Sequence, residues 1–380
     1  MDDFIPVNEP LLVGNEEKYV LECLETGWIS SEGPFVQRFE EQMAKTVGRK
    51  HGIAVANGTV ALELAVKALD ISLNDEVIVP TFTIISCAAA VVRVGAKPVF
   101  VDCDSDTWNI DVNKIEEKVN ERTKAIMIVH IYGLPVDIDP IIEIANRYNL
   151  KIIEDAAEMH GQTYKGRPCG SFGDISIFSF YPNKHITTGE GGMVLTDNEA
   201  IAERCRSLKN LCFNSKRRFV HDELGFNYRM TNMQAALGVA QLEQLDYFIG
   251  KKREMGRLYT ELLLDVPGLQ LPVTETSYAK NIYWVYGLVL KENVPFDNED
   301  IMKRLANKKI GTRPFFWPMH EQPIFKKMGL INEESLPNAE KIARRGFYIP
   351  SGLGLTGDQI YQVAKVVRDA MTEGWANGYL

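Results

Sequence analysis

Apolar runs and amphipathic segments alternate along the first half of the chain. The apolar runs are short and almost uninterrupted, as in parallel strands buried on both faces; they are residues 76–80, 98–102, 125–131, 151–154 and 174–180. Several segments between them repeat their apolar residues with the helical period, namely 86–95, 111–120 and 138–149. Strands that alternate with helices predict an α/β fold with a mostly parallel sheet covered on both sides.

The chain begins with two further amphipathic patterns. Residues 15–26 and 34–47 predict helices, and the turn between them holds Trp28 and Ser30. A short apolar strand over 52–56 comes next and precedes the alternating region.

Residues 57–59, Asn-Gly-Thr, separate that strand from an almost wholly apolar helix over 60–69. Glycine lets a backbone approach an anion closely, and the first N–H groups of a helix point toward it. The arrangement is a candidate phosphate site, although Asn-Gly-Thr turns also occur in many ordinary loops.

The pattern changes after residue 225. An apolar helix is predicted within 225–245, with Thr231 as its N-cap, and a charged helix over 246–263 extends it. The later elements are a strand near 282–290 and helices near 297–308 and 356–372. Because 380 residues exceed the usual size of a single core, we expect a large domain over 1–250 and a smaller C-terminal α/β domain over 251–380.

Composition argues against several classes of protein. A net charge of −9 disfavours a general nucleic-acid binder. No apolar run approaches the roughly 18 residues that cross a bilayer, and the acidic N-terminus is not a signal peptide. The six cysteines are scattered without a C-x-x-C pair, so we expect no metal site and no disulfide framework, but reduced thiols in a cytoplasm.

Ligands of parallel sheets bind at the carboxyl ends of the strands, where Lys184 is expected. It lies between the apolar run 174–180 and the glycines at 189, 191 and 192. Apolar surroundings lower the pKa of a lysine, because burial disfavours the ammonium form, and they make it an amine nucleophile that condenses with carbonyls. Most lysines are exposed, so an ordinary surface loop is the commoner interpretation of this residue taken alone.

Asp155 follows the strand over 151–154 and precedes two alanines, which places its carboxylate at a strand end among small side chains. A buried carboxylate needs a cationic partner. The protonated pyridine nitrogen of a cofactor is one such partner, whereas a helix cap or an arginine pair are the alternatives.

The loop over 311–325 concentrates Arg313, Phe316 and His320. An arginine among aromatic residues suits stacking on a base or sugar and pairing with phosphate. A cluster at a domain interface explains the same composition equally well.

Four segments together resemble one protein family, the DegT/DnrJ/EryC1/StrS sugar aminotransferases. They are NGT (57–59), EDAAEMHG (154–161), GSFGDISIFSFYPNKHITTGEGGMV (170–194) and GFNYRMTN (225–232). The resemblance covers essentially the whole chain. It implies pyridoxal 5'-phosphate as the cofactor, the aspartate aminotransferase fold (type I) with a seven-stranded sheet, and a homodimer with active sites at the subunit interface.

The resemblance also implies roles for single residues. Lys184 resembles the lysine that carries the cofactor and then serves as general base and acid. Asp155 resembles the partner of the pyridine nitrogen, and Glu158 the residue that hydrogen-bonds the phenolic oxygen. The implied phosphate ligands are Gly58, Thr59, Ser179 and, from the other subunit, Asn232.

The chain departs from the family in the segment PTFTIIS (80–86). The family usually has an aromatic residue at the place of Ile84, which stacks on the cofactor ring. Phe82 is the nearby aromatic residue in this chain and is therefore a candidate cofactor-binding residue, but which residue covers the ring stays open.

Further segments, among them WISS (28–31), HIYG (130–133) and TRPFFWPMH (312–320), resemble family members that act on a GDP-sugar. The implied reaction transfers the amino group of L-glutamate to C4 of GDP-4-keto-6-deoxy-D-mannose. The implied substrate contacts are Trp28, Ser30, Arg313, Phe316 and His320.

Three alternatives stand beside this reaction. A UDP- or dTDP-4-keto-6-deoxyhexose is possible as substrate, because a few loop side chains read the base. A dehydratase that removes the C3 hydroxyl of the same GDP-keto-sugar is similar to this chain, but it has histidine where Lys184 stands. A non-catalytic binding or regulatory protein with this fold would have no need of Lys184, Asp155 and Ser179.

Overall fold

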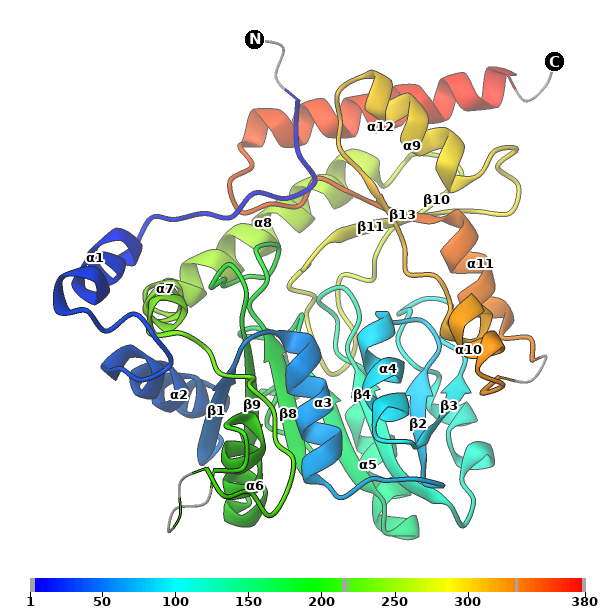
Figure 1. The fold of residues 1–380 in the computed structure, drawn as a ribbon. Helices are drawn as coiled ribbons and strands as arrows, with labels where there is room; N and C mark the ends of the chain where they lie inside the picture. Colours follow the sequence, from blue (N-terminus) through cyan, green and yellow to red (C-terminus); the bar gives the residue numbers. More distant parts are fainter. Residues whose placement is uncertain (1–3, 214–216, 218, 332–333, 378–380) are drawn as a thin grey trace.

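A seven-stranded sheet forms the centre of the protein in this computed structural model, which describes residues 4–213, 217, 219–331 and 334–377 (Figure 1). Its strands, in the order β1-β9-β8-β5-β4-β2-β3, are β1 (His51–Val55), β2 (Glu76–Pro80), β3 (Lys97–Val101), β4 (Thr123–Val129), β5 (Lys151–Asp155), β8 (Ile175–Ser179) and β9 (Gly192–Thr196). Strands β8, β5, β4, β2 and β3 are parallel, whereas β9 runs antiparallel to both neighbours. The predicted mostly parallel sheet is confirmed.

Helices cover both faces of this sheet, as Figure 1 shows. One core contains buried residues of α3 (Gly58–Ala68), α4 (Ile85–Arg93) and α6 (Glu199–Lys209). The opposite core contains those of α1 (Glu16–Thr26), α2 (Pro34–Val47), α5 (Ile138–Tyr148) and α7 (Asn232–Leu242). Along β4, Met127 faces the first core and its neighbours Ile126 and Ile128 face the second, because successive strand residues point to opposite faces.

One predicted helix of this region is wrong. Residues 111–120 form two single 3-10 turns, Val112–Lys114 and Glu116–Lys118. Ile115 between them is fully buried, but it is the one buried side chain of the segment. A stable helix needs an apolar stripe repeated every three to four residues, and this segment has a single anchor.

The predicted long helix after residue 225 is interrupted. It consists of α7 and of α8 (Leu245–Leu263), which are separated at Glu243 and Gln244. Thr231 caps α7 as predicted: its hydroxyl accepts the N–H of Gln234, and the Gln234 side chain accepts the N–H of Thr231. This reciprocal pair satisfies two backbone donors that a helix start leaves free.

A smaller antiparallel sheet has the strand order β10-β11-β13-β12. Its strands are β10 (Leu269–Gln270), β11 (Tyr286–Leu290), β13 (Gly346–Ile349) and β12 (Arg313–Pro314). The sheet shares a core with α8, α9 (Asn298–Asn307) and α12 (Gly357–Asn377). A separate hairpin consists of β6 (Thr163–Tyr164) and β7 (Arg167–Pro168).

The two sheets do not separate at one point of the chain. Ile5 packs in the core of the smaller sheet and forms a bridge with Ile310. Conversely, Phe325 of α10 (Pro323–Lys327) and Ala339 of α11 (Pro337–Arg345) pack in a core of the large sheet. The division into 1–250 and 251–380 therefore stays a prediction, from which these two segments depart.

Among the described residues, no helix combines the length and the apolar character that crossing a membrane requires.

The cap of α7 gives the first testable prediction. Replacing Thr231 by alanine removes the acceptor of the Gln234 N–H, and we expect the free energy of unfolding to fall by about 1 kcal/mol. Chemical denaturation measures the change. Thr46→Ala is the matched control, because the Thr46 hydroxyl only donates to the Gln42 carbonyl on the exposed side of α2. Equal losses in the two variants would contradict the role of the cap.

Candidate active site

A cavity of about 740 Å³ opens at the carboxyl ends of β4, β5 and β8. Residues that the sequence predicts at separate strand ends lie together here, because the carboxyl ends of parallel strands lie at one edge of a sheet. The predicted residues that line it are Gly58, Thr59, Asp155, Glu158, Ser179, Lys184 and Phe316.

The start of α3 forms one end of the cavity. Asn57 caps this helix with its side-chain oxygen, which accepts the N–H of Val60 at 3.0 Å. The cap does not use the N–H groups of Gly58 and Thr59, and both residues line the cavity. A Cβ on Gly58 would lie 2.7 Å from the Cβ of Ser179, so glycine is needed for this close approach. Helix N–H groups beside a serine hydroxyl suit a phosphate.

Asp155 ends β5 with its carboxylate at the cavity. One oxygen accepts the N–H of Ala157 at 3.0 Å, and the other accepts the thiol of Cys87 at 3.3 Å. Burial raises the pKa of this carboxyl, against these hydrogen bonds and the positive charge of Lys184. The anionic form is therefore costly until a cation reaches the cavity, as a protonated pyridine nitrogen does.

Lys184 reaches the cavity from the loop after β8, and its side chain is 10% exposed. Its Nζ lies 3.7 Å from Oε1 of Glu158 and 3.8 Å from the ring centre of Trp284. Burial lowers the pKa of this amine, although the nearby carboxyls of Glu158 and Asp155 act in the opposite direction. The predicted apolar setting of Lys184 is found in the structure.

Glu158 is the carboxyl closest to this amine. Burial raises its pKa to about 8, against the charge of Lys184 and the hydrogen bond from the Tyr132 N–H, which measures 2.7 Å. A carboxyl with this pKa is largely protonated at neutral pH. It can therefore donate a hydrogen bond to an oxygen of a bound molecule.

Ile84 and Phe82 differ in their access to the cavity. Ile84, the residue before α4, is 44% exposed and lines the cavity. Phe82 is fully buried and packs against Tyr132, Phe315 and Phe316 instead. Of the two residues, Ile84 lines the cavity and Phe82 does not; which residue covers a cofactor ring stays open.

Asn232, the predicted phosphate ligand from another subunit, is hydrogen-bonded within its own chain. It is fully buried, and its side-chain oxygen accepts the N–H groups of Phe35 and Val36 at 2.9 and 3.3 Å. Its amide group donates to the carbonyl of Trp28 and to the thiol of Cys23. These bonds join α1, α2 and α7 of one chain, and the contact of Asn232 with a phosphate of another subunit stays a prediction.

The predicted substrate contacts in the loop 311–325 differ in their access to the cavity. Phe316 lines the cavity. His320 is buried beside it, with one ring nitrogen at 2.7 Å from the Thr81 hydroxyl and the other at 3.2 Å from Glu340. Both nitrogens are used inside the protein, and the substrate contact of His320 stays a prediction that this geometry does not support. Arg313 on β12 is exposed and lies outside the cavity lining.

Trp28 and Ser30 are exposed on the turn between α1 and α2. Neither lines the cavity of its own chain. A substrate contact through these residues therefore requires a second subunit.

The sequence offered little signal for Trp284 and Tyr348, which also line the cavity. Trp284 precedes β11 and Tyr348 lies on β13, far along the chain from Lys184. Aromatic residues in a predicted strand are typical of an ordinary core, and contacts across such a sequence distance leave no local pattern.

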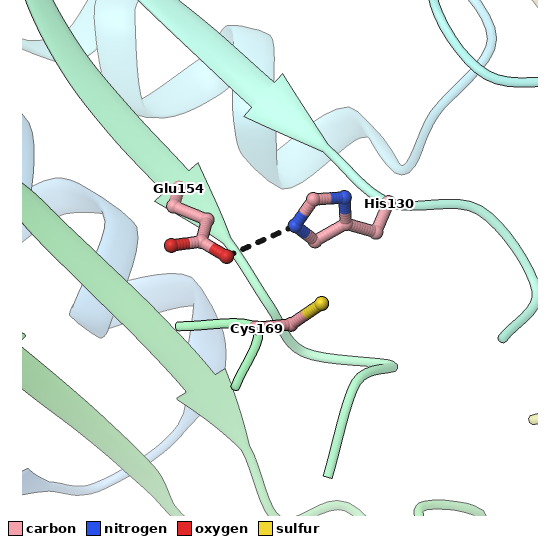
Figure 2. A group of neighbouring side chains, drawn as sticks. All are labelled: His130, Glu154 and Cys169. Carbon is pink, nitrogen blue, oxygen red and sulfur yellow. Dashed lines mark hydrogen bonds and ion pairs between the residues drawn. The ribbon is translucent and has the colours of Figure 1, made fainter. Parts of the chain in front are cut away.

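Figure 2 shows a second buried group near the cavity, His130, Glu154 and Cys169. His130 lies 3.0 Å from Glu154, and its other nitrogen accepts the N–H of Val136 at 3.1 Å. Glu154 also accepts the N–H groups of Gly170 and Phe172. Both ring nitrogens of His130 and both oxygens of Glu154 thus have hydrogen-bond partners. We interpret the group as a hydrogen-bonded link between β4, β5 and the loop before β8.

The lining of the cavity fits pyridoxal phosphate. The α3 terminus with Ser179 suits its phosphate, Asp155 suits its pyridine nitrogen, and Lys184 suits its aldehyde. The protonated carboxyl of Glu158 suits the phenolic oxygen. The buried carboxylate of Asp155, which has no cationic group in hydrogen-bond contact among the described residues, is the observation that supports this fit most directly.

Comparison with known proteins agrees with this geometry. The chain is 43% identical over 366 residues to GDP-perosamine synthase of Escherichia coli O157:H7, which covers 96% of this chain and 98% of that protein. The enzyme of the same name from Vibrio cholerae is 40% identical over the same shares. The crystal structure of the aminotransferase TlmJ from Streptoalloteichus hindustanus superimposes with a TM-score of 0.91 at 28% identity, over 97% of this chain and 99% of that one.

These likenesses confirm the predicted fold. Residues 11–368 match the family model described as the DegT/DnrJ/EryC1/StrS aminotransferase family, whose cofactor is the one that the cavity fits. The chain belongs to the DegT/DnrJ/EryC1/StrS aminotransferase family.

Proposed function

We propose that this protein uses pyridoxal phosphate to transfer the amino group of L-glutamate to C4 of GDP-4-keto-6-deoxy-D-mannose, giving GDP-perosamine and 2-oxoglutarate. The observation that carries the proposal is the buried amine of Lys184 between Glu158 and Trp284. The choice of sugar is supported by relatives named GDP-perosamine synthase that are 40% and 43% identical over 96% of this chain.

The residues of the cavity have separate tasks in this reaction. When bound, pyridoxal phosphate supplies an electron sink that stabilises the charge left after a proton leaves the carbon next to the amino group. Lys184 takes up that proton and returns it, because an amine with a lowered pKa is neutral often enough to act as a base. Asp155 would hold the pyridine nitrogen in its protonated form, and Glu158 would donate to the phenolic oxygen.

The neighbouring His185 supports transamination over dehydration. Its side chain is fully buried, and one ring nitrogen lies 3.3 Å from the carbonyl of Ile282. It faces away from the cavity, so it does not take the place of Lys184. The amine is the group that the cavity presents.

A TDP-sugar is the second candidate substrate. DesI, whose structure was solved in the presence of its TDP-sugar product, is 30% identical, over 98% of this chain and 94% of DesI. The higher identity to the GDP-perosamine synthases favours the GDP-sugar.

We also propose that the protein works as a homodimer with shared active sites in a cytoplasm. Apolar side chains on α1 and the turn after it are exposed to solvent, among them Leu24, Trp28 and Ile29 at 55%, 50% and 49%. An exposed apolar patch of this kind marks an interaction surface. All six cysteines are buried and free of disulfides, which suits a reducing compartment.

The amine of Lys184 is tested by absorption spectroscopy. We expect the wild-type protein to show the visible band of covalently bound cofactor, and Lys184→Ala to lose both the band and at least about three orders of magnitude in activity. Lys165→Ala is the control, because Lys165 pairs with Asp139 on the exposed surface. A folded Lys184→Ala variant that keeps the band would refute the assignment.

The substrate is tested with glutamate and a panel of GDP-, UDP- and dTDP-4-keto-6-deoxyhexoses, with the amino sugar product measured by mass spectrometry. We expect kcat/KM for the GDP-sugar to exceed that for the others by at least about 10-fold. A preference for a UDP- or dTDP-sugar would overturn the GDP assignment but leave the aminotransferase intact.

The shared site is tested by mixing two inactive variants, Lys184→Ala and Trp28→Ala. If each site combines Lys184 of one chain with Trp28 of another, mixed dimers contain one intact site and one doubly altered site. After subunit exchange we expect about a quarter of the wild-type activity to return, since about half of the dimers are mixed. Sedimentation must show dimers. A mixture of dimers that stays inactive, or a fully active Trp28→Ala, would contradict the shared site.

A further inference from the structure

A second lysine is buried close to the cavity. Lys252 of α8 is 1% exposed, and its Nζ donates to the carbonyl of Trp284 at 2.8 Å and to the carbonyl of Ser351. Within the described ranges, no carboxylate forms an ion pair with it. Burial and the charge of Lys184 lower the pKa of Lys252 to about 7.

A cation in this position is costly for the folded protein. Removing an ammonium group from water without a counter-ion is unfavourable, and a methionine of similar length would avoid that cost. The methionine would leave the two carbonyls unpaired, however, and unpaired buried acceptors are themselves unfavourable. Because these two costs oppose each other, stability alone does not account for a lysine here. Its hydrogen bond to the carbonyl of Trp284 is the feature to explain.

Trp284 connects this contact to Lys184. Its indole ring lies against the cavity with its centre 3.8 Å from Nζ of Lys184. The indole N–H donates at 2.8 Å to the carbonyl of Asn183, the residue directly before Lys184. The same tryptophan is thus bound by Lys252 at its main chain and contacts Lys184 with its ring.

The main chain of Trp284 is restrained from its other side as well. Gly133 follows β4 with a φ of 100°, and a Cβ there would lie 2.6 Å from the nitrogen of Trp284. The carbonyl of Gly133 accepts the N–H of Ile282 at 3.1 Å. Lys252 on the carbonyl of Trp284 and Gly133 against its nitrogen thus restrain the main chain from which the indole extends toward Lys184.

We propose that Lys252 is a positioning residue for the aminotransferase reaction, which holds the main chain of Trp284 so that the indole face stays against Lys184. The indole face attracts an ammonium group within about 6 Å of its centre, so it stabilises the protonated form of Lys184 and fixes where Nζ lies. Proton transfer by Lys184 depends on that position, because small displacements of a reacting group cost rate. The proposal rests on the proposed function.

The first variants distinguish a positioning role of Lys252 from a contribution to the stability of the fold alone. In Lys252→Met we expect kcat to fall about 10- to 100-fold, with KM for glutamate and for the nucleotide sugar changed less than 3-fold. Lys252→Arg, which keeps the charge and the donors, restores most of kcat. Lys252→Gln is the second variant if the methionine variant does not fold, because its amide keeps donors without a charge.

Arg345→Met is the matched control. Arg345 also gives its hydrogen bonds to main-chain carbonyls, those of Leu290, Lys291 and Val294. None of these three residues lines the cavity. We expect Arg345→Met to lower the thermal stability while kcat and KM stay within 2-fold of the wild type.

A double-mutant cycle tests the route through Trp284. Trp284→Leu removes the ring, and we expect Lys252→Met to lower kcat no further when it is added to Trp284→Leu, because the ring it positions is absent. The same cycle is measured on cofactor-free protein as the rate of pyridoxal phosphate uptake, followed by its absorption. This second measurement does not depend on the nucleotide sugar, so a wrong sugar assignment leaves it unaffected.

Two results would overturn the proposal. One is an additive cycle, in which Lys252→Met lowers kcat and uptake by the same factor with or without the Trp284 ring. The other is a Lys252→Met variant that behaves as Arg345→Met does and loses thermal stability alone.

Discussion

Removal of ionisable groups from water is the constraint on which the site depends. Burial is the largest influence on the pKa of Lys184, Asp155 and Glu158, and it acts against charge in each. It raises the pKa of the two carboxyls and lowers that of the amine, so the neutral form of each group becomes more populated. The lowered pKa makes the amine of Lys184 neutral more often than that of an exposed lysine, as a general base for a carbon-bound proton requires.

The parallel sheet brings these groups together at one edge. Register pairs Val129 with Asp155 and Asp155 with Ile177, so β4 and β5 end level and β8 continues two residues farther, to Ser179. Close backbone contacts at the start of α3, the candidate phosphate site, leave no room for larger residues. A Cβ on Gly192 would lie 2.4 Å from the carbonyl of Asn57, so β9 and the start of α3 touch directly.

The sequence predicted what depends on neighbouring residues and missed what depends on distant ones. Asp155 and Lys184 were found because a strand end is marked locally by an apolar run followed by small or polar residues. Trp284 was missed because it contacts Lys184 from a distant part of the sequence, which leaves no local pattern. Asn232 and His320 were assigned to ligands by resemblance, but a residue type does not reveal which partner it bonds. Both side chains bond their own chain.

The type of reaction depends on the register of a single loop. Lys184 faces the cavity and His185 faces the core, although they are adjacent. Phe180 closes this loop, since its carbonyl accepts the hydroxyl of Thr187 at 2.9 Å and the N–H of Thr188 at 3.0 Å. Because both ends of the loop are held, a shift by one residue would break these bonds and bring the imidazole of His185 to the cavity in place of the amine. The threonines after Lys184 therefore help to hold the loop in the register that brings the amine, and not the imidazole, to the cavity.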